Sequence, residues 1–156
     1  MSRIISRLSV IALGIMILGA TVVPSYADGA ADIKARQALM KSIGGKMKAI
    51  GAIAKGGDPA MLGAHTKELA ALAKKSKSAF PAGSGPEAGE TGALANIWTD
   101  PTGFNKVMAS FISTTEALEV AGASGDLKAV GAAMGMVGKN GCGACHKTYR
   151  MKKKKS

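Results

Sequence analysis

The feature that most constrains this chain is the run Cys142-Gly143-Ala144-Cys145-His146, close to its C-terminal end. Two thiols separated by two residues and followed directly by an imidazole form the pattern of covalent haem attachment. The thiols bond to the two vinyl groups of one porphyrin, and the adjacent His146 can then ligate the iron from below. The chain has two cysteines in all, so no disulfide framework competes for them. The motif predicts one covalent c-type haem, bound through Cys142 and Cys145 with His146 as proximal ligand.

Three other interpretations of the cysteine pair are weaker. A dithiol redox pair belongs near a βαβ pattern, and no strand-like alternation surrounds this motif. A zinc site would have only the distant His65 to add to the motif's own three ligands, whereas cysteine zinc sites usually come as two spaced pairs. A disulfide closing so short a loop would be strained. A thiol or metal protein without haem therefore stays as an alternative of a different class.

The first 27 residues have the pattern of a secretory signal peptide. Arg3 and Arg7 give a positive start, residues 8–23 are apolar, and Ser25-Tyr26-Ala27 is a small-x-Ala cleavage site. The apolar run is shorter than the roughly 20 residues that a membrane-spanning helix needs, which disfavours an uncleaved anchor. We expect a periplasmic protein with one domain over residues 28–156. Bacterial c-type haem is attached after export, so this prediction and the haem motif support each other.

The composition favours helices packed around a cofactor. Aromatic residues make up 4% of the chain, whereas Ala and Gly are abundant. Alanine favours helix, and small residues let helices approach each other or a flat cofactor closely. A core so poor in aromatic residues is thin for this length, and a buried porphyrin would supply the missing apolar volume.

The first half of the domain predicts two helices. Residues 32–55 carry an apolar stripe at helical spacing, which ends at Gly56-Gly57. Asp58-Pro59 then provides a capping residue and a proline at the first helical position, which open a second helix. The stripe of the first helix contains Ile33, Met40, Ile43, Met47, Ile50 and Ala54, and that of the second contains Leu62, His65, Leu69, Leu72 and Ser76.

The second half predicts a long crossover and two further helices. Residues 80–96 contain two prolines and four glycines, which interrupt the helical pattern. Asp100-Pro101 repeats the capped start and opens a third helix, which ends near Gly122 to Gly125. Asp126 caps a fourth helix that runs on toward Cys145. The predicted fold is all-α: an antiparallel four-helix bundle with a long crossover between helices two and three.

The position opposite His146 on the iron is the open question of function. Met40 is the leading candidate because it lies on the inward stripe of the first helix, and a thioether ligand raises a haem potential. Methionines on apolar stripes are more often core residues, and Met40 has competitors of its own type. His65 offers an alternative with two histidine ligands. The competing methionines are Met47, Met61, Met108, Met134 and Met136.

The chain resembles the cytochrome c-prime family, the class II c-type cytochromes. The haem motif near the C-terminus is followed by an aromatic and a basic residue, Tyr149 and Arg150, as in that family. The run Arg36-Gln37-Ala38-Leu39-Met40 resembles the family's first helix. The segments that continue the resemblance, in the expected order, are Ile50 to Gly56, Phe80-Pro81 and Ile97-Trp98.

The resemblance implies a four-helix bundle with haem, in one of two functional types. In the low-spin type a methionine at the position of Met40 ligates the iron and the protein transfers electrons. In the high-spin type the sixth position is empty, and nitric oxide or carbon monoxide binds there. We expect the low-spin type, which the stretch after Met40 resembles more closely, with the gas-binding type as the alternative. The resemblance also implies that Arg36, Gln37 and Tyr149 lie near the haem.

The charge distribution bears on partners. The formal net charge is +11, and no acidic residue follows Asp126, whereas six of the last ten residues are Lys or Arg. Such a region can steer the protein toward an acidic redox partner or hold it loosely at an anionic membrane surface. An exported chain without interleaved aromatic residues does not fit nucleic-acid binding. No catalytic constellation is visible, so we expect a carrier and not an enzyme, as a monomer or a homodimer.

Overall fold

The computed structural model describes residues 28–152, so the predicted signal peptide and the end of the lysine run lie outside the described residues. The long helices are α1 (Gly29–Ile53), α2 (Leu62–Ser76) and α4 (Pro101–Ser124). A fourth helical rod is made of α5 (Leu127–Met136), a π-helical segment (Val137–Gly143) and α6 (Ala144–Tyr149). Short helical turns lie at Pro59–Met61, Pro86–Ala88 and α3 (Asn96–Thr99).

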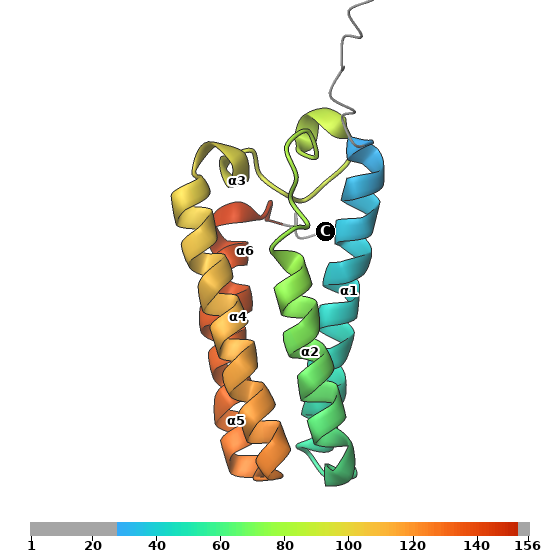
Figure 1. The fold of residues 1–156 in the computed structure, drawn as a ribbon, viewed down its shortest axis with the longest axis vertical. Helices are drawn as coiled ribbons and strands as arrows, with labels where there is room; N and C mark the ends of the chain where they lie inside the picture. Colours follow the sequence, from blue (N-terminus) through green and yellow to red (C-terminus); the bar gives the residue numbers. More distant parts are fainter. Residues whose placement is uncertain (1–27, 153–156) are drawn as a thin grey trace, which may run out of the picture.

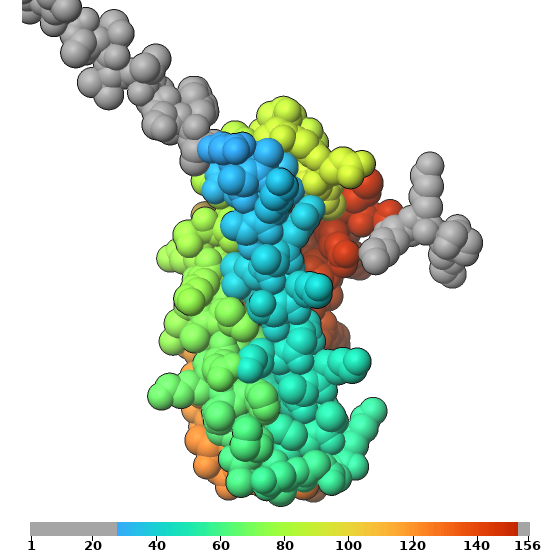
Figure 2. All heavy atoms as spheres, turned by 90° about the vertical axis from the view of Figure 1, so that its right-hand side faces the viewer, coloured from blue at the N-terminus to red at the C-terminus, as the bar shows by residue number. Residues whose placement is uncertain are grey.

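These rods form an antiparallel four-helix bundle, which confirms the predicted fold class. In Figure 1, α1 runs down and α2 runs up beside it; α4 then runs down and the last rod returns upward. The connections from α1 to α2 and from α4 to α5 are short turns at the lower end. Residues 80–95 cross the upper end between α2 and α3, and we call this segment the crossover. Figure 2 shows the crossover above α1, with the C-terminal segment beside the upper half of that helix.

Aspartates start the helices, as the sequence predicts. Asp58 caps the turn Pro59–Met61, which lies directly before α2, and its side chain accepts a hydrogen bond from the Ala60 amide at 3.0 Å. Asp126 caps α5 and accepts one from the Lys128 amide at 2.8 Å. Asp100 does the same for Gly103 at 2.9 Å. Each bond satisfies a backbone donor that has no partner inside the helix. The first helix begins at Gly29, three residues before the predicted start, because Asp28 caps it.

The last rod is not one continuous α-helix, which the sequence pattern did not predict. Its π-helical segment lies directly before and within the haem motif, and such segments are frequent at functional sites. Gly141 in this segment lies against α4, where a Cβ atom would come within 2.8 Å of the Phe111 ring. Ser110 of α4 also donates a hydrogen bond to the Asn140 carbonyl at 3.1 Å. The absence of a side chain at Gly141 therefore lets this segment approach α4 closely, and the hydrogen bond from Ser110 holds it there.

The lower half of the bundle is a closed apolar core. It is built around five fully buried side chains: Ile50, Leu62, Leu69, Leu118 and Val130. The α2–α4 contact there depends on Gly122, since a Cβ atom at this position would collide with the side chain of Thr66. In helix α2, Thr66 lies on the buried face and its neighbour His65 is half-buried. Within residues 28–152, the helices are all too short or too polar to span a membrane.

Candidate haem site

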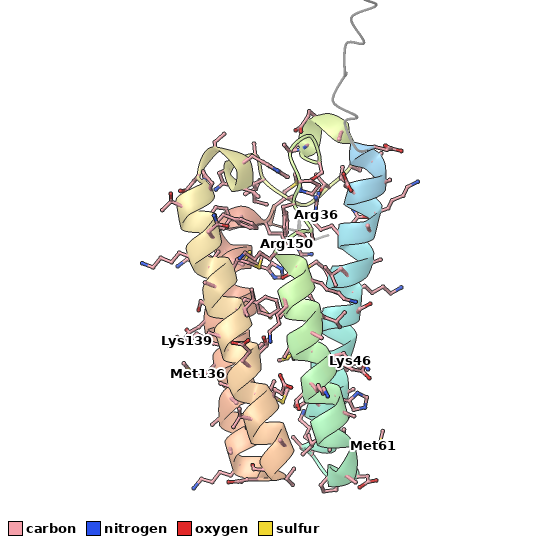
Figure 3. All side chains as sticks on the ribbon, viewed as in Figure 1. Arg36, Lys46, Met61, Met136, Lys139 and Arg150 are labelled. Carbon is pink, nitrogen blue, oxygen red and sulfur yellow. The ribbon has the colours of Figure 1, made fainter. Side chains whose placement is uncertain are left out.

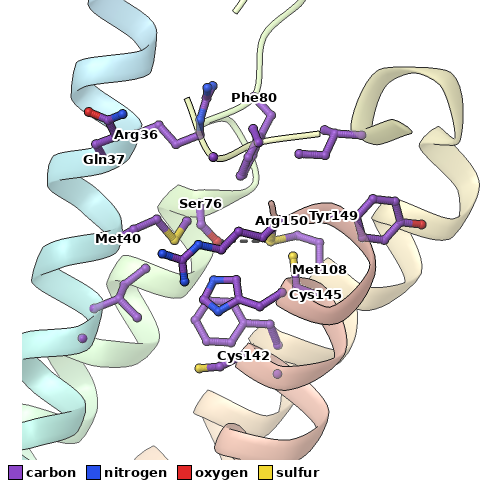
Figure 4. A pocket seen from close by; sticks show the side chains of 18 of the residues that line it. Arg36, Gln37, Met40, Ser76, Phe80, Met108, Cys142, Cys145, Tyr149 and Arg150 are labelled. Atoms are coloured by element: carbon purple, nitrogen blue, oxygen red, sulfur yellow. Dashed lines mark hydrogen bonds between the residues drawn. The ribbon is translucent and has the colours of Figure 1, made fainter. Parts of the chain in front are cut away.

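The upper half of the bundle contains a cavity of about 730 Å³ between α1 and the C-terminal rod. Figure 4 shows α1 and α2 on one side and the C-terminal rod on the other, with the crossover above. Met40 and Met47 line the cavity from α1, and Met108 and Phe111 line it from α4. The volume lies within the range of about 300–1,000 Å³ that is usual for ligand and cofactor pockets.

Both cysteines and His146 line this cavity, as the motif predicts. Cys142 and Cys145 are free and half-buried, and they come from adjacent turns of the π-helical segment and α6. Burial raises the pKa of both thiols, that of Cys145 to about 11, so both are protonated near neutral pH. His146 stays exposed at the cavity mouth, but partial desolvation, followed by the charge of Arg150, lowers its pKa. The imidazole is therefore neutral at pH 7, the form that ligates iron.

The residues present fit a c-type haem. Two thiols for the thioether bonds and one neutral imidazole for the iron lie together on one wall of the cavity. The opposite wall carries methionine side chains from α1, and the space between is large enough for a cofactor. A thiol or metal protein without haem would not explain why two thiols and an imidazole line a large apolar cavity. No cluster of three or more His, Cys, Asp or Glu side chains suited to a bare metal ion exists within residues 28–152.

Three of the methionines proposed for the sixth position line the cavity: Met40, Met47 and Met108. In Figure 4 the Met40 side chain extends from α1 into the cavity, whereas Met108 lies on the far side next to Cys145. The Met108 thioether lies 3.1 Å from the Ser76 hydroxyl and is buried. Met61 and Met136 are exposed and lie outside the cavity lining, in the positions that Figure 3 labels. Met134 also lies outside the cavity lining.

His65 lies far from the motif. Its Nδ1 is 3.4 Å from Lys46 Nζ, and Lys46 forms an ion pair with Glu68 on the outer surface of α1 and α2. His65 is not among the residues that line the cavity. Ligation by two histidines therefore has no support in the fold.

Arg36 and Gln37 both line the cavity, but their polar groups bond to the crossover. The guanidinium of Arg36 is buried and donates hydrogen bonds to Ala79, Ser84 and Thr91. Gln37 is more exposed and donates one hydrogen bond to the Glu90 carbonyl at 3.2 Å. Both residues thus join α1 to the crossover at the cavity edge.

Tyr149 lines the cavity and closes the upper end of the last rod. Its hydroxyl donates a hydrogen bond to Asp100 Oδ2 at 2.7 Å, which lowers the pKa of Asp100 and, together with burial, raises the pKa of Tyr149 to about 12. The Tyr149 ring packs on Phe104, which in turn packs on Phe80 with ring centres 4.9 Å apart. Arg150 follows and, in Figure 4, reaches across the cavity toward α1.

Several residues of this site were not predicted from the sequence. Phe111 forms part of the cavity wall, and Asp100 binds Tyr149 as well as capping α4. Residues 92–94 pair with residues 149–151: the Leu94 amide donates to the Tyr149 carbonyl at 3.1 Å, and the Met151 amide donates to the Gly92 carbonyl at 2.8 Å. The sequence carried no signal for this pairing, because it joins two irregular segments.

The bundle, the cavity and the motif together define a haem protein with one covalently bound c-type haem, held through Cys142 and Cys145. The profile of the family described as Cytochrome C' matches residues 31–150, nearly the whole described chain. The chain belongs to the cytochrome c' family.

Relatives in this family share sequence and fold with the chain. A protein named cytochrome c-556 from Agrobacterium tumefaciens (strain B2A) is 36% identical over 80% of this chain and 100% of its own length. A cytochrome c' from Pararhodospirillum photometricum is 32% identical over 76% of this chain and 94% of its own. A solved cytochrome c' structure from "Rhodobacter Spheriodes" superposes with a TM-score of 0.72 at 31% identity, covering 81% of this chain and all of that one.

Proposed function

We propose that this protein is an exported electron carrier and that His146 and Met40 would ligate the iron of its haem. The observation that carries the proposal is the placement of Met40 on α1, where it extends into the cavity across from the wall that bears the cysteines and His146. The match to proteins named cytochrome c-556, the methionine-ligated subtype of the family, supports the same choice.

The bound haem supplies one-electron chemistry, and the residues of the chain set its conditions. The imidazole of His146 and the thioether of Met40 are both uncharged donors, and a methionine ligand raises the potential. Met47 and Phe111 give the cavity wall an apolar surface, which disfavours water beside a bound cofactor. Cys142 and Cys145 hold the cofactor permanently, so it is not lost between encounters with partners. No proton transfer or substrate-binding group is needed for this role.

Absorption spectra of the purified protein test the sixth ligand. We expect a low-spin spectrum for the natural protein that does not change when carbon monoxide is added to the ferrous form. Met40→Ala should convert it to a high-spin form that binds carbon monoxide. Met134→Ala serves as the matched control, because Met134 lies outside the cavity lining. An unchanged spectrum of Met40→Ala would contradict the ligand assignment, and a high-spin natural protein would support the gas-binding alternative.

The proposed partner is an acidic redox protein. The rod that carries the haem motif bears Lys139 and Lys147, and Arg150 and Lys152 follow directly after its end. No acidic residue follows Asp126 in the sequence. A positive surface next to the haem would speed encounters with a negative partner, and salt would screen this effect. Electron-transfer rates that do not fall with ionic strength would argue against it, and binding to anionic vesicles alone would favour a membrane surface instead.

Export and assembly can be tested on the natural protein. If residues 1–27 are a signal peptide, the periplasmic fraction should contain haem-loaded protein that begins at Asp28, as measured by intact mass. One solved relative is described as a cytochrome c' with an unusual ligand-controlled dimer dissociation, at a TM-score of 0.74 and 25% identity. The solution mass of this protein, with and without carbon monoxide, would show whether it is a monomer or a homodimer.

A further inference from the structure

We propose that Arg36 is a positioning residue that fastens the crossover over the haem cavity and so limits the access of external molecules to the haem. The proposal rests on the haem assignment, but it does not depend on which residue is the sixth ligand. It gives Arg36 a different role from direct contact with the cofactor.

The hydrogen bonds of Arg36 all go to the segment that leaves α2 and crosses the bundle. One terminal nitrogen donates to the Ala79 carbonyl at 3.2 Å and to the Ser84 hydroxyl at 2.8 Å. The other donates to the Ser84 carbonyl at 2.8 Å and to the Thr91 hydroxyl at 3.1 Å. The two terminal nitrogens carry four N–H groups, and each has an acceptor. These bonds therefore engage both terminal nitrogens with the protein itself, and the fifth donor, the Nε–H, takes no part in them.

Aromatic contacts add to this attachment. The Arg36 guanidinium lies 5.0 Å from the centre of the Phe80 ring and 5.9 Å from that of Trp98. The Trp98 indole N–H in turn donates to the Pro81 carbonyl at 3.0 Å. Arg36 is only 4% exposed, so these charge-assisted contacts are made away from water, where they are strongest.

Few other side-chain hydrogen bonds hold the crossover: the Trp98 indole N–H donates to the Phe80 and Pro81 carbonyls, and Gln37 donates to the Glu90 carbonyl. The regular structure of the crossover is limited to the turn Pro86–Ala88, and Gly83 and Gly89 have positive φ angles of 78° and 147°. The last part is anchored separately by the pairing of residues 92–94 with residues 149–151. Between α2 and this pairing, Arg36 joins three separate points of the chain to α1.

The same segment forms the roof of the cavity. Phe80, Thr91, Gly92 and Ala93 line the cavity, and Figure 4 shows Phe80 and Arg36 at its upper edge. Thr91 is both a roof residue and a bonding partner of Arg36, so loss of the guanidinium removes one of the bonds that hold the roof. Local opening of such a segment has a free energy set by the few contacts that hold it.

Hydrogen exchange of the haem-loaded protein tests the attachment. Arg36→Lys keeps the positive charge but cannot bond to four acceptors at once. We expect the amides of residues 82–91 to exchange at least about tenfold faster, while the amides of α2 and α4 are unchanged. The matched control is Lys34→Arg, the reverse exchange on the exposed face of α1. Unchanged exchange in Arg36→Lys would overturn the proposal.

Ligand access is measured in the Met40→Ala background, in which Met40 cannot ligate the iron, so the result is separate from the ligand assignment above. After flash photolysis, carbon monoxide should rebind at least about tenfold faster when Arg36→Lys is added. Equal rebinding rates would show that the roof does not limit access. If Arg36→Lys does not accumulate, Ser84→Ala combined with Thr91→Val removes two acceptors and leaves Arg36 in place. Faster exchange of residues 82–91 in that variant would support the attachment, and unchanged exchange would overturn it.

Discussion

The two halves of the bundle use the same four rods in different ways. In the lower half, fully buried aliphatic side chains fill the space between the helices, and Gly122 lets α2 and α4 approach closely. In the upper half, the rods enclose a cavity, and long side chains and the crossover surround it. The lower half holds the helices together by direct packing, whereas the upper half leaves the room that the haem requires. The fully buried aliphatic side chains of the lower half are therefore not among the residues that surround the cavity.

The largest expected effect comes from removing the haem attachment in the upper half. Changing Cys142 and Cys145 together to Ser should abolish covalent haem, measured as the absence of haem on the denatured protein in a gel. The lower half should keep its helices, because its fully buried side chains do not line the cavity. Slow amide exchange near Ile50 and Leu118 would show this, and complete unfolding of both halves would contradict the separation.

Truncation of one apolar side chain in each half should have unequal costs. Leu118→Ala removes a fully buried side chain from the lower core, and we expect it to lower the free energy of unfolding by about 2–5 kcal/mol. Met47→Ala removes a partly exposed side chain from the cavity wall, and its cost should be smaller. Urea unfolding of both haem-loaded variants measures the difference. Equal losses would mean that the two halves are packed alike.

A methyl group added at Gly122 tests the close approach of α2 and α4. In Gly122→Ala the new Cβ would lie 2.6 Å from Thr66 Cγ2, so the helices must move apart at a cost of about 1–3 kcal/mol. Gly131→Ala in α5 is the matched control, because that position is exposed and has open space. Alanine favours helix, so the control should gain up to about 1 kcal/mol. The haem spectrum should stay the same in both variants.

The smallest effect concerns the hydrogen bond between Tyr149 and Asp100 at the upper end. The bond lowers the pKa of Asp100, so its contribution to stability is complete above the ordinary aspartate pKa of about 4 and is lost as the pH falls through the lowered value. Tyr149→Phe should therefore unfold at a lower urea concentration than the natural protein at pH 7. This difference should shrink below pH 4. A difference that is constant with pH would show that the carboxylate is not involved.

Much of the fold could be predicted because it depends on local signals. The aspartate caps, the prolines at helix starts and the apolar stripes placed the helices within a few residues. The burial of Thr66 was not predicted: Leu62, Leu69 and Ser76 of the predicted stripe are buried, and Thr66 is buried with them, whereas His65 is half-buried. The π-helical segment was missed, because it depends on the contact of Gly141 with Phe111 across the bundle.

The sequence alone determined that this protein carries haem, through a motif whose chemistry depends only on the spacing of Cys142, Cys145 and His146. It also determined the order of the helices, since caps and turns act over a few neighbouring residues. Only the tertiary structure could show which methionines line the cavity, because this depends on how the rods are rotated relative to each other. It likewise decided the role of Arg36. The acceptors of that side chain lie more than 40 residues away in the crossover, and no local pattern connects positions so far apart.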